Sequence, residues 1–440
     1  QKVKCVKGLI SASCTPEPLE KGVLRAKHGL PVFRDGTIRF DMSDVPVTHF
    51  RPCEIGTSWK RLKELGYTHD IDGEQMTSDE QLLELYPQDM IPSRNSIKHL
   101  ISICDFTDEL LTRFYGLDSF YSVDTESDLV GQLAIGLAPH TSGGVLCRII
   151  GFTDASGGYA HTLFHAAKRR NCDGDEDSIM LLLDGLLNFS REILPANRGG
   201  RMDAPLVLTT RLNPTELDKE ALNVDCAWFY NRSFYEATLT QPHPKELSES
   251  MDYAERRIGS IGAVRGYGFT HGLEALNSGP INSAYKILDT MVDKMNAQLE
   301  LGGRLRSVDV QTVASLVVEG HFFPDLRGNL VAFTRQKVRC GRCGHSYRRL
   351  PLAGKCIRKR RGGRESGLWG RSSGQDQCGG NLIMTVSEGA VRKYVKVAEH
   401  VMDTFDTSQY TQQKYTWLAE TLDGLFANER IKVYTLDDFV

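Results

Sequence analysis

The residues best suited to chemistry are two aspartates one position apart, Asp173 and Asp175, in the run Asn171-Cys172-Asp173-Gly174-Asp175. Gly174 can adopt the backbone angles of a tight turn, so both carboxylates can converge on one side of a loop. Mg²⁺ prefers one or two carboxylates, with water and substrate phosphates completing its coordination. Three cations directly precede this run: Lys168, Arg169 and Arg170. A divalent ion beside such cations indicates a site for a phosphate-bearing substrate.

Two simpler explanations of the acidic run stay open. Acidic residues ahead of a helix commonly cap it, and the apolar spacing from Ile179 to Ser190 predicts a helix directly after the run. Four aspartates also have the spacing of a calcium-binding loop: Asp173, Asp175, Asp177 and Asp184. Ser178 stands where that loop needs a glycine, which argues against calcium. His165 and Lys168 lie three positions apart and would share one face of a helix.

A second cluster consists of four cysteines: Cys340, Cys343, Cys356 and Cys378. Four thiolates, the first two spaced as C-x-x-C, suit a tetrahedral Zn²⁺ site whose role is structural. The alternative is a half-site formed by the first pair with two unrelated cysteines. Lys and Arg residues surround the cluster, among them Arg348 and Arg349, and this local excess suits a phosphodiester backbone. A solvated basic loop is the alternative for the stretch from Arg358 to Arg371.

Composition limits the class of protein. The 440 residues are 40% hydrophobic and 25% charged, which excludes a wholly disordered chain, a collagen and a coiled coil. The formal net charge is only −3, so a polyanionic partner is not indicated by bulk charge and any basic surface must be local. No stretch approaches the roughly 20 apolar residues of a membrane span, so no membrane partner is expected. Most of the 11 cysteines are scattered singly, which favours a reducing, intracellular compartment.

The elements that must position these residues are mixed. Short apolar runs around Asp35-Gly36 predict a β-hairpin, and residues 133–136 and 145–151 predict strands. A short helix is expected over 161–170, and further helices over 281–300, 308–319, 388–404 and 411–427. No secretory leader is expected, and the abrupt start at Gln1 is expected of the later part of a longer protein.

Several long motifs resemble the large subunit of the archaeal D-family DNA polymerase. They include the stretch from His161 to Asp177, Met202-Asp203-Ala204-Pro205, Arg211-Leu212-Asn213-Pro214, Gly266-Tyr267-Gly268-Phe269-Thr270-His271, His321 to Leu330, and Glu388 to Tyr394. The resemblance runs over essentially the whole chain. Because that subunit is much longer, the chain is similar to its C-terminal part.

The resemblance implies an α+β fold with a double-psi β-barrel, one of a pair related to the core of multi-subunit RNA polymerases, with helical insertions. Asp173 and Asp175 would be catalytic and bind two Mg²⁺ ions during template-directed nucleotidyl transfer. Phosphate contacts would come from His165, Lys168, Arg169, Arg170 and Asn171. The other barrel would lie upstream, so this part alone would be inactive. An RNA polymerase fragment is disfavoured, because that family's element carries three aspartates in the order N-A-D-F-D-G-D.

The resemblance also implies partners and a location. The partners would be a small 3′–5′ exonuclease subunit, primer-template DNA and deoxynucleoside triphosphates, in the cytoplasm at the nucleoid. The C-terminal residues Leu436 and Phe439 resemble part of a sliding-clamp-binding peptide, against the alternative of a frayed tail. One departure concerns zinc: the family usually has its second cysteine pair as C-x-x-C, whereas an Arg/Gly/Ser-rich insertion, residues 357–377, separates Cys356 from Cys378 here.

The expected organisation has five parts. They are a β-rich and helical segment, 1–125; the catalytic barrel, 126–260, with the acidic loop 171–177; a helical DNA-binding and connecting region, 261–335; the zinc knuckle, 336–385; and C-terminal helices with the tail, 386–440. Two functional hypotheses follow: a catalytic segment of a replicative DNA polymerase, or a non-catalytic, zinc-stabilised DNA-binding and subunit-docking module.

Overall fold

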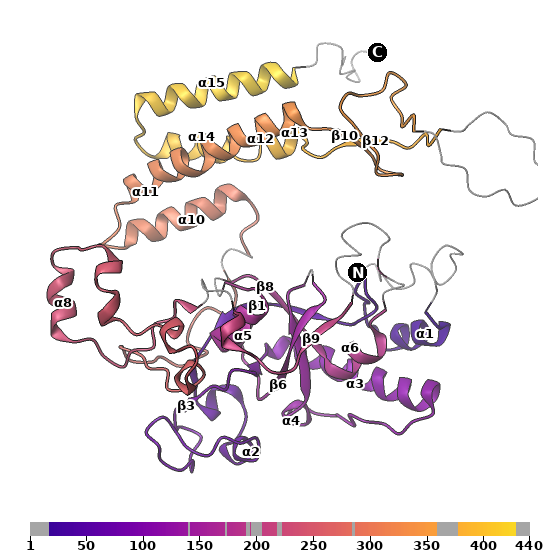
Figure 1. Ribbon diagram of the computed structural model, residues 1–440, viewed down its shortest axis with the longest axis vertical. Coiled ribbons are helices and arrows are strands. Elements are labelled where there is room, and N and C mark those ends of the chain that lie inside the picture. The colour runs from indigo at the N-terminus through magenta and orange to yellow at the C-terminus, as the bar shows by residue number, and fades with distance from the viewer. Residues whose placement is uncertain are drawn as a thin grey trace, which may run out of the picture. The chain divides into compact units, whose positions relative to one another are not determined.

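A computed structural model describes residues 17–139, 141–171, 174–190, 194, 205–217, 222–283, 287–358 and 377–427. The chain divides into two compact units, Gln1–Ser283 and Ala284–Val440. Helices and strands occur in both, so the fold is α+β (Figure 1). Among the described residues, no helix is long and apolar enough to cross a membrane.

A closed β-barrel forms the centre of the first unit. Its seven-stranded sheet has the order β4-β7-β1-β8-β5-β6-β9, and β4 also pairs with β6, which closes all strands but β9 into a ring. The strands are β1 (Phe40–Pro46), β4 (Asp89–Ile91), β5 (Leu133–Leu137), β6 (Gly143–Ile149), β7 (Gly157–Ala160), β8 (Glu176–Leu181) and β9 (Val207–Thr209). Gly158 lies in close contact with two core methionines, because an added Cβ would lie 2.4 Å from the Met42 sulfur and 2.6 Å from Met90 Cε, so these side chains would have to shift. The closed ring leaves β9 as an edge strand, parallel to β6.

Helices cover parts of this barrel. The helices of the first unit with apolar contacts to its core include α1 (Leu19–Lys27), α3 (Ile97–Glu109), α4 (Glu126–Leu129), α5 (Thr162–Ala167) and α6 (Leu182–Asn188). A smaller apolar cluster lies under the β2–β3 pair, His49–Phe50 with Leu83–Glu84, and includes Leu62 of α2 (Trp59–Glu64). A further short helix of this unit is α8 (Arg232–Thr238).

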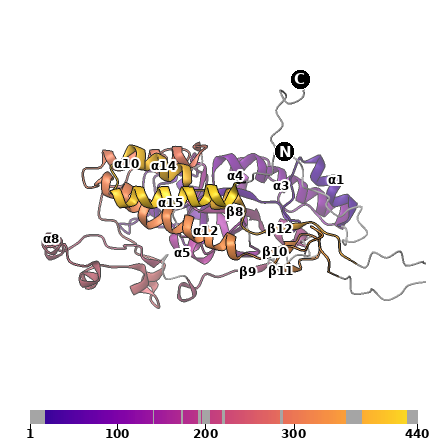
Figure 2. The same ribbon diagram turned by 90° about the horizontal axis from the view of Figure 1, so that it is seen from above.

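The second unit is a helical bundle with a small sheet. Its helices are α10 (Met291–Arg304), α11 (Val310–Val317), α12 (Phe323–Arg335), α13 (Glu388–Val391), α14 (Val395–Thr404) and α15 (Gln409–Phe426). Residues of α10, α11, α12, α14 and α15 share one apolar cluster, and these helices lie side by side in both ribbon views (Figures 1 and 2). The sheet has the order β11-β10-β12, with bounds Ser346–Tyr347, Val338–Cys340 and Leu382–Met384. The expected helix 411–427 corresponds to α15, whereas the expected helix 388–404 is divided into α13 and α14.

Two expected elements are wrong. The helix predicted over 179–190 begins only at Leu182, because Glu176–Leu181 form the buried strand β8. A strand buried on both faces has a continuous apolar run, which periodicity alone does not separate from a buried helix. The hairpin at Asp35-Gly36 is absent from the described residues. The Asp35 carboxylate is instead buried, accepts hydrogen bonds from the Thr37 amide and hydroxyl, and pairs with Arg39.

A buried ion pair joins the end of α5 to the start of β8, at the base of the acidic loop. The Lys168 ammonium pairs with the Asp177 carboxylate, and both side chains are 0% exposed. Lys168 Nζ also lies 3.4 Å from His165 Nδ1, while His165 Nε2 lies 3.1 Å from the Val45 carbonyl oxygen. A carbonyl oxygen only accepts, so Nε2 carries the proton and Nδ1 accepts from Lys168. His165, Lys168 and Asp177 are called the loop clamp below.

The contacts within the loop clamp shift the pKa values of Asp177 and His165. Burial alone would raise the pKa of Asp177, but Lys168 and His165 offset this, and the pKa lies below its ordinary value. Burial, together with the neighbouring Lys168, lowers the pKa of His165, in keeping with a neutral ring. The Asp177 contribution to stability is therefore present above the unfolded pKa of about 3.9 and is lost as the pH falls through the lowered folded value.

We expect Lys168→Met to lower the free energy of unfolding by about 3–5 kcal/mol at pH 7, because it leaves the Asp177 carboxylate buried without its cation. The double variant Lys168→Met/Asp177→Asn should recover a large part of this loss. Urea denaturation of the 440-residue chain, followed by circular dichroism, measures both. Lys63→Met, at an exposed lysine of α2, is the matched control and should change stability by less than about 0.5 kcal/mol. Equal losses for Lys63→Met and Lys168→Met would contradict the role of the loop clamp.

Candidate active site and candidate metal centre

The acidic loop follows the C-terminal end of α5, and the turn between them uses a backbone position that is normally occupied by glycine. The Arg170 amide donates to the His165 carbonyl at 3.0 Å and the Arg169 amide to the Ala166 carbonyl at 2.9 Å. This is the Schellman pattern, whose turning residue has a left-handed backbone. Arg169 occupies that position with φ 60°, a conformation that costs a non-glycine residue of order 1 kcal/mol. The side chain of Arg169 is thereby exposed at the start of the loop.

The described end of the loop carries an accessible carboxylate. Gly174 has φ 90°, the turn conformation that its residue type predicts. The Asp175 side chain is 36% exposed and lies 3.6 Å from the Arg170 guanidinium. The Asp175 carbonyl oxygen accepts a hydrogen bond from the Asp44 amide of β1 at 3.0 Å, which holds the loop against the barrel. Cys172 and Asp173 lie outside the described residues.

Both simpler explanations of the acidic run fail on this geometry. The run precedes a strand, β8, so it does not cap a helix. Asp177 pairs with Lys168 inside the barrel, and Asp184 is buried in α6, where its carboxylate accepts from the Ile38 amide at 2.7 Å. These two carboxylates therefore have separate protein partners and do not share one calcium site.

The expected phosphate contacts divide into two groups. Arg169 and Asn171 are exposed beside the loop, and Arg170 is partly exposed. His165 and Lys168 are buried in the loop clamp, where their nitrogens already have partners. A direct phosphate contact by either of these two stays a prediction, and the geometry favours a supporting role.

Asp44 of β1 is a carboxylate of this site that spacing along the chain does not reveal. It is buried, and burial raises its pKa, with His165 offsetting part of the effect and Asp177 adding to it. The barrel brings it beside the loop because β1 pairs with β8, Ser43 opposite Glu176. From the sequence, Asp44 could have been identified as a residue of this site only if the pairing of β1 with β8 had been known.

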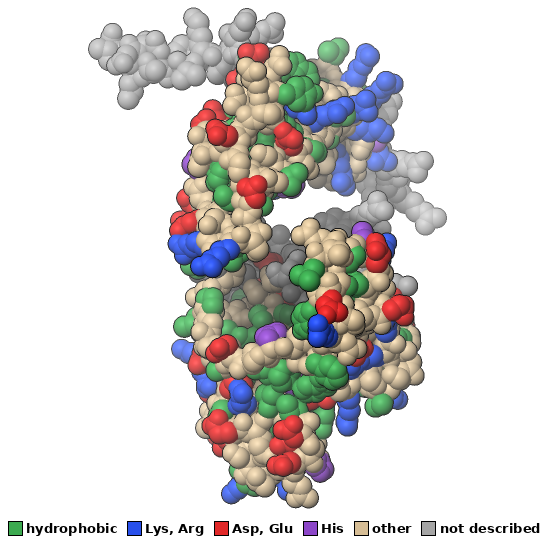
Figure 3. Space-filling model, turned by 90° about the vertical axis from the view of Figure 1, so that its left-hand side faces the viewer, with side chains coloured by type: hydrophobic (Ala, Val, Ile, Leu, Met, Phe, Trp, Pro, Cys, Tyr) green, Lys and Arg blue, Asp and Glu red, His purple; other side chains and the backbone are tan. Residues whose placement is uncertain are grey.

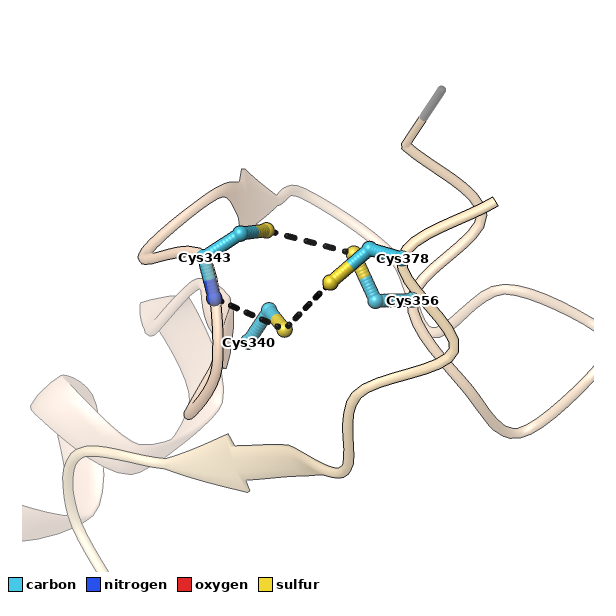
Figure 4. A group of neighbouring side chains, drawn as sticks. All are labelled: Cys340, Cys343, Cys356 and Cys378. Carbon is cyan, nitrogen blue, oxygen red and sulfur yellow. Dashed lines mark hydrogen bonds between the residues drawn. The ribbon is translucent and has the colours of Figure 1, made fainter. Parts of the chain in front are cut away.

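The four cysteines form a compact cluster in the second unit (Figure 4). Their Sγ atoms all lie within 4.8 Å of one another, with 3.8 Å between Cys340 and Cys378 and 3.5 Å between Cys343 and Cys356. Tetrahedral zinc with Zn–S bonds of about 2.3 Å requires sulfur–sulfur distances of roughly 3.8 Å. The donor set therefore fits zinc, and the half-site alternative is disfavoured.

Backbone groups support this cluster. Amides of Arg342 and Cys343 donate to Cys340 Sγ at 3.4 and 3.5 Å, and these hydrogen bonds lower the pKa of that thiol. The thiolate is the form that binds a metal. Gly380 leaves room for the sulfurs, since an added Cβ would lie 2.7 Å from Cys340 Sγ.

The two ends of the insertion meet at this cluster. The Cys378 amide donates to the Arg358 carbonyl at 2.8 Å, and the Cys356 amide donates to the Gly380 carbonyl at 2.9 Å. The separation of Cys356 and Cys378 along the chain is therefore compatible with one four-sulfur site. Residues 359–376 lie outside the described residues.

Basic side chains accompany the cysteine cluster. Arg348 and Arg349 follow β11 and are both exposed. These two exposed positive charges suit an anionic partner. On the face of the molecule drawn in Figure 3, Lys and Arg side chains also gather at the upper right.

Comparison with known proteins identifies the family. Residues 1–294 match the family described as DNA polymerase II large subunit DP2, catalytic domain. The chain is 51% identical over 439 residues to the DNA polymerase II large subunit of Methanocella arvoryzae, covering 100% of this chain and 37% of that protein. It is 49% identical over 425 residues to that of Pyrococcus furiosus, covering 97% of this chain and 32% of that protein. The chain thus spans about a third of the length of these relatives. It belongs to the family of archaeal DNA polymerase II large subunits, as its motifs predict.

Proposed function

We propose that this chain is the catalytic part of a DNA-directed DNA polymerase, and that Asp173 and Asp175 bind its catalytic Mg²⁺ ions. The observation that carries the proposal is the family match over residues 1–294, which includes the acidic loop. The loop geometry supports it: Asp175 offers an accessible carboxylate, and the loop is held at its base by a buried ion pair. We further propose that the closed barrel is of the double-psi type and that a second barrel lies in the upstream part of the longer protein.

The residues around the loop have distinct proposed roles. Bound Mg²⁺ would supply charge stabilisation at the transferring phosphorus and a lower pKa for the attacking hydroxyl. Arg169, Arg170 and Asn171 would contact phosphates from the exposed side of the loop. Lys168 and His165 would act as positioning residues, because their nitrogens bind Asp177 and Val45.

The proposed partners follow from the same assignment. They are primer-template DNA, deoxynucleoside triphosphates and a small 3′–5′ exonuclease subunit, in the cytoplasm at the nucleoid. A sliding clamp would bind through Leu436 and Phe439, which lie outside the described residues. The four-cysteine cluster would bind Zn²⁺ and stabilise the small sheet, which has little apolar core of its own.

A second candidate function is supported by the exposed arginines beside the cysteine cluster. In this alternative the chain is a zinc-stabilised module that binds DNA and docks another subunit without catalysing a reaction. The two functions are compatible, because the isolated chain could bind DNA while the complete enzyme extends primers.

Asp173→Asn and Asp175→Asn should each reduce primer extension at least about 100-fold, because each removes a charged metal ligand at the transferring phosphate. The assay uses the complete two-subunit enzyme carrying the substitution, with excess primer-template and Mg²⁺. Asp118→Asn, at an exposed aspartate outside the loop, is the control and should keep wild-type extension. Wild-type rates for both loop variants would remove these residues from the chemistry.

Cys356→Ser should lower the zinc content of the purified chain from about one equivalent and lower the unfolding temperature of the second unit. Elemental analysis and a thermal melt report these two effects without any activity assay. Cys53→Ser, at an exposed cysteine of the first unit, should change neither. Full zinc retention by Cys356→Ser would indicate a site that does not use this sulfur.

Arg348→Gln/Arg349→Gln should weaken DNA binding by the 440-residue chain about tenfold at low salt, since two phosphate contacts are lost. Fluorescence anisotropy with a labelled oligonucleotide measures this affinity. Asp175→Asn should leave it unchanged or slightly stronger, because it removes one negative charge. Unchanged binding by the arginine variant would argue against the binding-module function.

A further inference from the structure

A groove of about 630 Å³ lies on the first unit, outside the acidic loop. Three segments line it: Tyr86–Gln88 before β4, Arg211–Thr215 after β9, and Gly259–Arg265. Arginines stand at two of these segments, and no Asp or Glu is among the lining residues that the structure describes. The lining therefore has a positive charge that its own residues do not neutralise.

The two arginines, Arg211 and Arg265, are exposed, and neither has an ion pair within the described part of the chain. Two other arginines of this unit differ. Arg148 binds the Asp89 carboxylate through two nitrogens, and Arg257 binds Asp252. A guanidinium that keeps its hydrogen-bond fork available matches the geometry of a phosphate.

Arg265 also lies on a fixed support. Its guanidinium carbon lies 5.1 Å from the centre of the Tyr86 ring. That ring stacks on Tyr67 at 4.2 Å with an interplanar angle of 12°, and the Tyr86 hydroxyl donates to the Gly66 carbonyl at 2.9 Å. Stacking on a held ring reduces the number of arginine conformations that a ligand would have to order.

The sheet register gives the distance of the groove from the acidic loop. Ser178, Leu137, Gly144 and Leu208 lie opposite one another across β8, β5, β6 and β9. Asp175 precedes this row and Arg211 follows it, on strands that run in the same direction. At strand dimensions the path between the two residues is roughly 20 Å along the strands and about 14 Å around the curved sheet. One nucleoside triphosphate does not bridge this distance, so a ligand that contacts both must be a polymer with repeated phosphates.

We infer that the groove lined by Arg211 and Arg265 binds the phosphodiester backbone of a DNA strand at a distance from the acidic loop, an inference that rests on the proposed polymerase function. Arg211 belongs to the motif Arg211-Leu212-Asn213-Pro214, for which the catalytic proposal has no role. The two guanidinium groups would each contact one phosphate and hold the strand in place while the loop acts on another part of the DNA.

The test is the salt dependence of DNA binding by the 440-residue chain. Arg211→Gln/Arg265→Gln should bind a labelled oligonucleotide about tenfold more weakly at low salt. The slope of log affinity against log salt should fall by about 1.4 for a single strand or about 1.8 for a duplex, the values for two lost phosphate contacts. Arg211→Lys/Arg265→Lys keeps the charges and should retain most of the slope.

The matched control, Arg61→Gln/Arg232→Gln, removes two exposed arginines that pair with Glu64 and Glu236, and should keep wild-type binding.

A second titration distinguishes a DNA strand from a free nucleotide as the source of the phosphate. Wild-type chain and the glutamine variant are each titrated with deoxythymidine triphosphate in place of the oligonucleotide. Equal triphosphate binding by both, with weaker DNA binding by the variant, supports a strand site. A loss of triphosphate binding with unchanged DNA binding would overturn the inference, as would a wild-type affinity and salt slope for the variant.

Failure of this inference is distinguishable from failure of the polymerase proposal. If Asp175→Asn abolishes extension and the arginine variant binds DNA normally, only the groove assignment is wrong. If Asp175→Asn extends primers at the wild-type rate, the catalytic proposal fails, whatever the salt slope shows.

Discussion

The contact between the Lys168 ammonium and the Asp177 carboxylate lies where α5 ends and β8 begins, and the geometry of the acidic loop depends on it. A charge pair out of water is stable only when its remaining groups also have partners. His165 meets this condition, since one ring nitrogen accepts from Lys168 and the other donates to Val45 of β1. Three elements are thus joined directly beneath the loop. Asp175 can then remain exposed to solvent without the loop depending on its carboxylate for stability.

The positions of the charges also explain why adjacent cations have different roles. The chain turns at Arg169 in a left-handed conformation, so Lys168 points into the protein while Arg169 is exposed. A run of three cations in the sequence therefore separates into a buried Lys168, an exposed Arg169 and a partly exposed Arg170 that lies beside Asp175. Residue type and spacing do not reveal this division, because it depends on the backbone angle of a single residue.

The acidic loop and the Cys340–Cys343 pair were predicted from local residue types and short spacings, whereas the α+β class came from the resemblance to a known family. The sequence did not predict β8, since a strand with neighbours on both sides has the same apolar run as a buried helix. Nor did it predict Asp44, which reaches the loop only through the pairing of β1 with β8. The groove arginines are similar: Arg211 was noted as part of a motif, but it lines the same groove as Arg265 only because the segment after β9 and residues 259–265 fold together.

The backbone hydrogen bond that joins Arg358 to Cys378 has a consequence for how this family can vary. Chain added between two points that already touch changes mainly the entropy of closing a loop, and each doubling of its length costs only about 0.6 kcal/mol. Segments of very different size can therefore be accommodated there while the sulfurs keep their positions. Sequence patterns that require a short gap between the last two cysteines would overlook such members, whereas a search that allows any gap length would find them.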